Sequence, residues 1–249
     1  MINKTKNFIK SNPLFMPFVV SQTVFYFLMH FVKTGYTTEI MYGSIILCFL
    51  YATAHIKFSW DNNHFVWLGV VFTCIADFFL VMCSPAKETE GVLSFSIVQL
   101  LYFTYLFLQE KKEKVRVIHV VVRGIAILIC SLLPFIVLKE KVDFLSVLSM
   151  FYISNLAVNV AFALSDKKTR LFGIGLLLFI LCDFSVGFCA GAGVYFNIID
   201  GGFLSAIVNS NFNVAWLFYL PSQVVISIFL ALNFQKAKRE EIQKEISGE

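Results

Sequence analysis

Residues 65–84 read FVWLGVVFTCIADFFLVMCS, an apolar run whose only charged residue is Asp77. A run of about 20 apolar residues has the length of one membrane-spanning helix. Further runs of this kind follow one another along the chain, and we expect spans at residues 15–32, 40–54, 65–84, 91–108, 115–137, 144–164, 171–193 and 213–233. The runs lack the alternation of lipid-facing barrel strands. The sequence therefore predicts an all-α, eight-helix transmembrane bundle that forms a single membrane domain, with residues 1–14 and 234–249 as its tails.

The composition excludes two other classes of protein. Of the 249 residues, 58% are hydrophobic and 14% charged, and the mean hydropathy is +0.78. A soluble domain has about 25% charged residues, and one water-soluble core of this length could not hide 29 phenylalanines. The net charge of +4 and the short basic clusters provide no continuous basic face, which excludes a nucleic-acid binder.

The basic residues predict how the bundle is oriented. If the N-terminus is cytoplasmic, most of the 20 lysines and arginines fall in cytoplasmic segments, and the opposite loops contain only Lys33, Lys87, Lys139 and Lys141. Positively charged residues concentrate on the cytoplasmic side of membrane proteins. We therefore expect a multi-pass protein of the cell membrane with both termini in the cytoplasm.

Two of the predicted spans share a pattern, a glycine eight residues before an aspartate: Gly69 with Asp77, and Gly175 with Asp183. The two spans run in the same direction, which favours a parallel internal repeat of four helices plus four, with chance similarity as the alternative. At about 1.5 Å per residue, both carboxyl groups lie roughly 18 Å from the inner surface, near mid-membrane. An aspartate at that depth costs about 2.5–3.5 kcal/mol, so it usually faces the bundle interior and has a function.

Further polar side chains reach nearly the same level from neighbouring spans and predict one interior polar layer: Gln99, Tyr102, Asn155, Asn159, Tyr219 and Gln223. Interhelical hydrogen bonding is the structural alternative for the amides, and packing is the alternative for the tyrosines. Arg123 lies nearer the inner side, where it either snorkels to lipid headgroups, binds a lipid phosphate or pairs with an aspartate. The histidines are scattered and the six cysteines form no C-x-x-C pair, so we expect no metal and no cofactor.

Small residues accompany both aspartates. We expect Gly69, Thr73 and Ser84 on the interior face of one helix, and Gly175, Gly187 and Gly191 on that of the other. Such a stripe lets neighbouring helices approach closely.

Two carboxyl groups at one depth in a low-dielectric site cannot both ionise easily, so one keeps its proton while the other is charged. A hydrolase needs this division, because one group protonates the substrate and the other activates water. The same pair could serve a proton-coupled transporter, or the protein could bind lipid without catalysis, and both alternatives stay open.

The motifs around these residues resemble those of the YhhN-type lysoplasmalogenases over residues 36–233. Gly69 to Leu80 resembles a G-x-x-F-S-x-x-G-D-x-x-L helix, and Gly175 to Asp183 a second acidic helix. A G-x-x-x-F-x-x-x-H-x-x-Y motif and a Y-x-x-A-Q motif are matched by Gly91, Phe95, Gln99 and Tyr102, and by Tyr219 to Gln223. The chain departs from the family pattern at Gln99, which replaces a histidine, and also at Met41, Ser44, Ala76 and Cys189.

The resemblance implies hydrolysis of the vinyl-ether bond of a lysoplasmalogen, a lysophospholipid drawn from the bilayer, to a fatty aldehyde and a glycerophospho-alcohol. Protonation of the alkene carbon gives an oxocarbenium ion that water attacks. On this hypothesis Asp77 and Asp183 are the catalytic acid and base, in an order that the sequence does not assign. Arg123 would meet the phosphate, and water and glycerol oxygens would be oriented by Gln99, Tyr102, Asn155, Tyr219 and Gln223.

Overall fold

The computed structural model describes residues 12–32, 35–56, 60–195 and 214–247, and the regular structure within these ranges is entirely helical. This confirms the all-α class. The eight α-helices that it contains are α2 (Phe15–Phe31), α3 (Thr37–Thr53), α4 (Asn63–Asp77), α5 (Glu88–Gln109), α6 (Glu113–Val137), α7 (Phe144–Ser165), α8 (Arg170–Tyr195) and α10 (Val214–Ser247). The loop that the sequence places between residues 194 and 212 lies almost wholly outside the described residues.

Six of the described helices are long and apolar enough to cross a membrane: α4 with its continuation to Met82, α5, α6, α7, α8 and α10. The other two, α2 and α3, have 17 residues each and fall short of that length. The chain is therefore a multi-pass membrane protein by its helices. The count of eight spans, the cytoplasmic termini and the internal repeat stay predictions.

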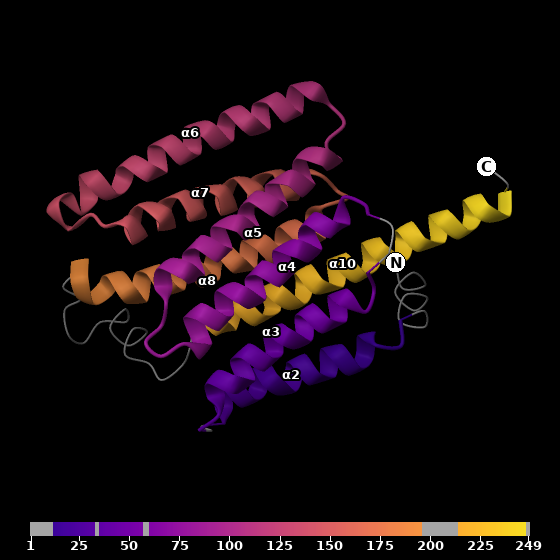
Figure 1. The fold of residues 1–249 in the computed structure, drawn as a ribbon, viewed down its shortest axis with the longest axis horizontal. Helices are drawn as coiled ribbons and strands as arrows, with labels where there is room; N and C mark the ends of the chain where they lie inside the picture. The colour runs from indigo at the N-terminus through magenta and orange to yellow at the C-terminus, as the bar shows by residue number, and fades with distance from the viewer. Residues whose placement is uncertain (1–11, 33–34, 57–59, 196–213, 248–249) are drawn as a thin grey trace.

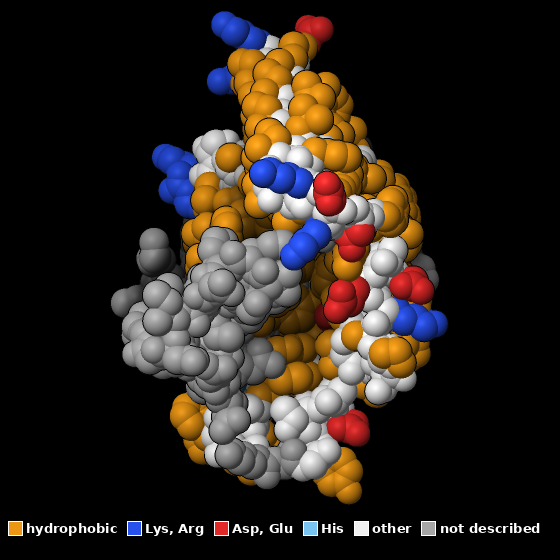
Figure 2. All heavy atoms as spheres, turned by 90° about the vertical axis from the view of Figure 1, so that its left-hand side faces the viewer, with side chains coloured by type: hydrophobic (Ala, Val, Ile, Leu, Met, Phe, Trp, Pro, Cys, Tyr) orange, Lys and Arg blue, Asp and Glu red, His pale blue; other side chains and the backbone are white. Residues whose placement is uncertain are grey.

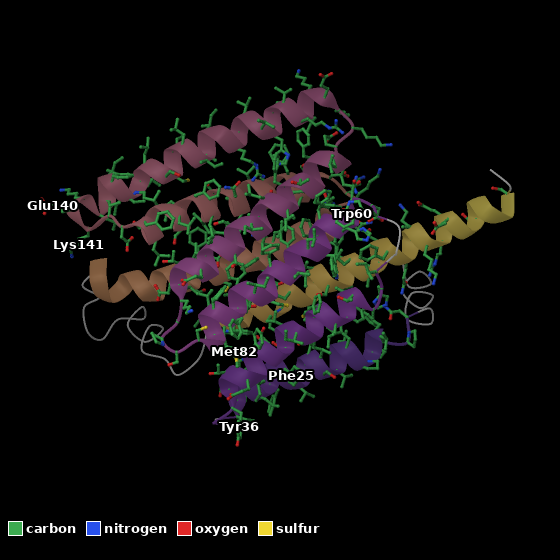
Figure 3. All side chains as sticks on the ribbon, in the orientation of Figure 1. Phe25, Tyr36, Trp60, Met82, Glu140 and Lys141 are labelled. Atoms are coloured by element: carbon green, nitrogen blue, oxygen red, sulfur yellow. The ribbon has the colours of Figure 1, made fainter. Side chains whose placement is uncertain are left out.

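The helices lie side by side in one bundle, with α6 along one edge beside α7 and α2 along the opposite edge beside α3 (Figure 1). Between these edges α4 packs against α5, and α8 packs against α7 and α10. Trp60 lies at the end of the bundle opposite to Glu140 and Lys141 (Figure 3). The side chains of Trp60 and Tyr36 are 64% and 71% exposed, as is typical of aromatic residues at membrane–water interfaces.

Glycine lets two helix pairs approach closely. A Cβ atom at Gly69 would lie 2.2 Å from Cε1 of Tyr102, so α4 and α5 meet there without a side chain between them. At Gly175 a Cβ atom would lie 2.7 Å from Cγ1 of Ile226 on α10. These two positions therefore confirm part of the predicted small-residue stripe.

The stripe prediction is wrong at Ser84 and Gly187. A π-helical turn over Phe78–Met82 ends α4, so Ser84 lies in an exposed bend that no longer follows the helical face of Asp77. Gly187 is exposed, and a Cβ atom there would meet no atom of the described residues within 4 Å. Gly191 lies where side chains are not described.

The ends of α7 and α10 show how the sequence sets the helix limits. At the start of α7 the carboxylate of Asp143 accepts a hydrogen bond of 2.8 Å from the backbone N–H of Ser146, and the Ser146 hydroxyl completes a capping box. These bonds hold the pKa of Asp143 below its ordinary value. The helix α10 continues beyond the apolar span to Ser247, so the charged tail is helical as well.

Candidate functional site

Asp77 is the last residue of α4, and its side chain points into the bundle. It is 3% exposed, and its Oδ2 atom accepts a hydrogen bond of 2.6 Å from the hydroxyl of Tyr219 on α10. The π-helical turn begins at the next residue, Phe78. Single π turns within helices are rare and occur frequently at functional sites.

Asp183 is in the middle of α8 and has the same kind of partner on a different helix. Its Oδ2 atom accepts a hydrogen bond of 2.6 Å from the hydroxyl of Tyr152 on α7. Asp183 is half-buried, and its neighbour Phe184 is 64% exposed. Each carboxyl group is thus held by one tyrosine hydroxyl, but the two differ in their access to the surroundings.

Two phenylalanine rings connect the two tyrosine–aspartate pairs. The Phe95 ring centroid lies 5.9 Å from that of Tyr152 and 6.4 Å from that of Tyr219. The Phe179 ring lies 5.4 Å from Tyr219 and 6.4 Å from Tyr152. Cys182, directly before Asp183 on α8, belongs to the same buried core cluster as both tyrosines. The two pairs therefore belong to one interior layer with an aromatic wall.

Arg123 forms a second polar cluster on the α6 side of this layer. Its Nη1 atom donates a hydrogen bond to Oδ1 of Asn155, and its Nη2 atom donates one of 2.6 Å to Oδ1 of Asn159. The guanidinium also lies 4.1 Å from the centroid of the Phe103 ring, a cation–π contact. The Asn159 amide donates onward to Oε1 of Gln99 at 3.0 Å.

Two interpretations of Arg123 do not hold. It is only 6% exposed, so it does not snorkel to the membrane surface. No ion pair joins it to Asp77 or Asp183 among the described residues. Its Nε atom is buried without a hydrogen-bond partner in the same part of the chain. The Arg123 guanidinium is therefore a buried cation bound by neutral amides, and such an arrangement favours an anionic ligand.

The remaining predicted residues are buried near these two groups. Tyr102 is fully buried, with its ring against Gly69 and its hydroxyl near Thr73. Gln223 is 1% exposed on α10, one turn beyond Tyr219. The Nε2 atoms of Gln223 and Gln99 have no hydrogen-bond partner among the described residues. Buried donors of this kind normally find a partner, so both are available to an oxygen atom of a ligand.

Sequence reasoning missed Tyr152 and His119. The spacing i, i+3 and i+7 on α7 places Tyr152 on the same helix face as Asn155 and Asn159, so this polar face could have indicated Tyr152. His119 stacks on Phe162 with 3.7 Å between ring centroids and lies 3.2 Å from Nη2 of Arg123. One turn before Arg123 on α6, it could have been found by the same spacing argument.

The two carboxyl groups can supply acid–base chemistry in a largely apolar interior. Figure 2 looks onto the end of the bundle that carries the α6–α7 turn, and shows a hollow lined by hydrophobic side chains with Asp and Glu side chains at its rim. In the parts of the chain that the structure describes, no group of three or more His, Cys, Asp and Glu side chains could hold a metal ion. Asp77 and Asp183 each place one tyrosine-bound carboxyl group in this interior.

One comparison with known proteins gives a match. The model of the YhhN family matches residues 39–228, a range that includes both aspartates, Arg123, Gln99 and Gln223 but not α2. No curated protein and no solved structure matches the chain.

Proposed function

The chain belongs to the YhhN family, which includes lysoplasmalogenases, and we propose that it hydrolyses the vinyl-ether bond of a lysoplasmalogen within the membrane. The products are a fatty aldehyde and a glycerophospho-alcohol. One observation carries the proposal: two tyrosine-bound carboxyl groups, at Asp77 and Asp183, share one interior layer of a bundle of membrane-length helices. Carboxyl groups are costly in this environment and are kept where they have a function.

The reaction needs one acid and one base. A carboxyl proton passes to the second carbon of the alkenyl chain, whose π electrons form the new C–H bond and leave an oxocarbenium ion at the first carbon. A carboxylate stabilises this cation and takes a proton from the water that attacks it. The hemiacetal so formed gives its hydroxyl proton to the carboxylate that had protonated the alkene. Its bond to the glycerol oxygen then breaks as that oxygen takes the proton that the other carboxyl group received from water, and the aldehyde and the glycerophospho-alcohol are released.

The surrounding polar residues would position the substrate. The amide donors of Gln99 and Gln223, which have no partner in the part of the chain that is described, can bind water or a glycerol oxygen. Tyr219 orients Asp77, and Asn155 and Asn159 hold Arg123. The phosphate of the substrate would supply the anion that the Arg123 cluster lacks. Tyr102 shapes the layer against Gly69.

The direct test follows aldehyde release from lysoplasmalogen by purified protein in liposomes. Asp77→Asn and Asp183→Asn keep the size of the side chain but remove its proton chemistry, so each should lower kcat by about a hundredfold or more. The matched control is Glu140→Gln in the turn after α6, which removes an exposed carboxyl group and should keep full activity. A wild-type protein that releases no aldehyde would refute the proposal, and uptake driven by a proton gradient in the same liposomes would support transport instead.

A second test addresses the phosphate. Arg123→Gln removes the cation and should raise KM for lysoplasmalogen about tenfold, because a charge-assisted contact is lost in both ground and transition states. With an alkenyl glycerol that lacks phosphate, wild type and variant should have similar KM values. An equal loss on both substrates would show that Arg123 has only a structural role.

A further inference from the structure

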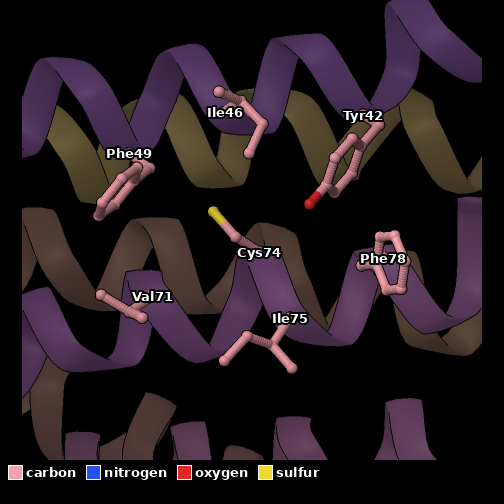
Figure 4. A pocket seen from close by; sticks show the side chains of 7 residues that line it. All are labelled: Tyr42, Ile46, Phe49, Val71, Cys74, Ile75 and Phe78. Carbon is pink, nitrogen blue, oxygen red and sulfur yellow. The ribbon is translucent and has the colours of Figure 1, made fainter.

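A groove of about 250 Å³ lies between α3 and α4. Tyr42, Ile46 and Phe49 of α3 face Val71, Cys74 and Phe78 of α4 across it (Figure 4). Its walls are hydrocarbon and sulfur except for one hydroxyl, that of Tyr42. The groove is somewhat smaller than a typical pocket for a complete small ligand, about 300–1,000 Å³, so it suits part of a lipid.

One end of the groove adjoins Asp77. Phe78 follows Asp77 directly and Cys74 precedes it by one turn, and both line the groove. The ring centroid of Tyr42 lies 6.2 Å from that of Phe78 at this end. From this end the groove runs past Cys74 to Val71, roughly 10 Å along the helix at about 1.5 Å per residue. Phe78 is 47% exposed, so the groove is open to the lipid side of the bundle.

The order of the groups across the bundle matches the order of the parts of the proposed substrate. Arg123 lies on α6, the helix at one edge of the bundle (Figure 1). Asp183 accepts its hydrogen bond from α7, and Asp77 accepts its hydrogen bond from α10. The groove lies on the α3 side. In a lysoplasmalogen the phosphate, the glycerol, the vinyl ether and the hydrocarbon chain follow one another in the same order. The hydrocarbon end therefore falls at the groove.

We propose that the groove between α3 and α4 binds the alkenyl chain and that Asp77, at its edge, is the acid that protonates this chain. The inference rests on the proposed function and deepens it. The carbon that takes the proton is the second carbon of the chain, so the acid must lie where the chain begins. Asp183 lies on the glycerol side, where its carboxylate takes a proton from the water that attacks the first carbon.

The first test fills the far end of the groove. Val71→Trp should lower the ratio of kcat/KM for a long alkenyl chain to that for a short one by about tenfold, because overpacking excludes the longer chain. Ile46→Trp fills the groove from the opposite wall and should shift the ratio in the same direction. The matched control is Leu50→Trp on α3, a position that is 54% exposed and outside the groove, and its ratio should equal that of wild type.

Retained activity on the short chain shows that a variant is folded. An unchanged ratio in Val71→Trp or in Ile46→Trp would overturn the chain-binding groove, and so would loss of short-chain activity in both. Either result leaves the proposed function standing as long as wild type releases aldehyde. A wild-type protein that releases no aldehyde would instead refute the proposed function itself, so failure of the proposed function can be distinguished from failure of the chain-binding groove.

The second test assigns the acid. In D2O, Asp183→Asn keeps the acid but lacks the base, so the protonated intermediate returns to substrate and the recovered lysoplasmalogen should carry deuterium at the second carbon of the chain. Asp77→Asn lacks the acid, and its recovered substrate should carry none. Mass spectrometry of the recovered lipid measures both. The assignment would be overturned if the substrate recovered from Asp77→Asn contains deuterium. It would also be overturned if the substrate recovered from both variants contains none.

Discussion

Asp77 and Asp183 occupy matching places on two helices, each eight residues after a glycine, yet their surroundings differ. Asp77 is 3% exposed, next to a π turn and an apolar groove, and its tyrosine comes from α10. Asp183 is half-buried in a continuous helix, and its tyrosine comes from α7. The local sequence pattern places a carboxyl group at a similar position in each helix, and the helices packed around that group determine how accessible it is to water.

This difference suits a division of roles between the two carboxyl groups. An enclosed carboxyl group favours its neutral, proton-bearing form, whereas one with more access to its surroundings can carry charge and activate water. The comparison thus supports Asp77 as the acid and Asp183 as the base. This division of roles would be refuted if equivalent substitutions around Asp77 and around Asp183 had equal effects on activity.

The largest difference is expected for the two tyrosines. Tyr219→Phe leaves the buried Asp77 without its described hydrogen-bond donor, and an unpartnered buried group costs about 1–3 kcal/mol, so kcat should fall about tenfold to a hundredfold. Tyr152→Phe should cost less, about tenfold at most, because water can replace the hydroxyl at the half-buried Asp183. Steady-state aldehyde release gives both values, and the losses should lie in kcat rather than in KM.

The control for this pair is Tyr51→Phe. The Tyr51 hydroxyl is also in the bundle, where it accepts a hydrogen bond of 2.8 Å from Asn12, but it lies away from both carboxyl groups. Its loss should leave kcat and the pH–rate profile unchanged, whereas Tyr219→Phe should alter both. Equal losses for Tyr219→Phe and Tyr152→Phe would show that the two carboxyl groups work in equivalent surroundings.

The two aspartates could be found from the sequence because a charge in an apolar run stands out, and the helical repeat gives its depth. The same reasoning placed Gln99, Asn155, Tyr219 and Gln223 in the interior, where the structure also has them. Tyr152 was missed because tyrosine is common in apolar helices as a packing residue.

The features that the sequence could not predict depend on contacts between helices. No pattern distinguishes the apolar residues of the α3–α4 groove from other lipid-facing side chains, so the groove could not be predicted. Ser84 was misplaced because a regular helix was assumed, whereas Ser84 follows the π turn. Gly187 lies in a regular helix, but a Cβ atom added there meets no described atom within 4 Å, and helical spacing alone does not show which face has a neighbour.

The glycines test whether the two acidic helices pack alike. Gly69→Ala puts a methyl group 2.2 Å from the ring of the fully buried Tyr102, and overpacking of this kind should lower the free energy of unfolding by about 1–3 kcal/mol. Gly175→Ala meets an aliphatic side chain, Ile226 at 2.7 Å, which can adjust more easily than a ring. Its cost should be smaller, about 1 kcal/mol. Thermal unfolding in one detergent compares the two variants, and equal costs would indicate equivalent packing.

The smallest effect is expected at Gly187, which lies on α8 after Asp183 and where an added Cβ atom would have no described atom within 4 Å. Since alanine is favoured over glycine within a helix, Gly187→Ala should raise the free energy of unfolding by about 0.5–1 kcal/mol. The same thermal unfolding measurement applies, with Gly175→Ala as the matched variant on the same helix. A marked loss of stability in Gly187→Ala would mean that another helix does pack on this face, as the small-residue pattern predicts. The difference between Asp77 and Asp183 in access to their surroundings would then narrow, because α8 would be enclosed on that side as well.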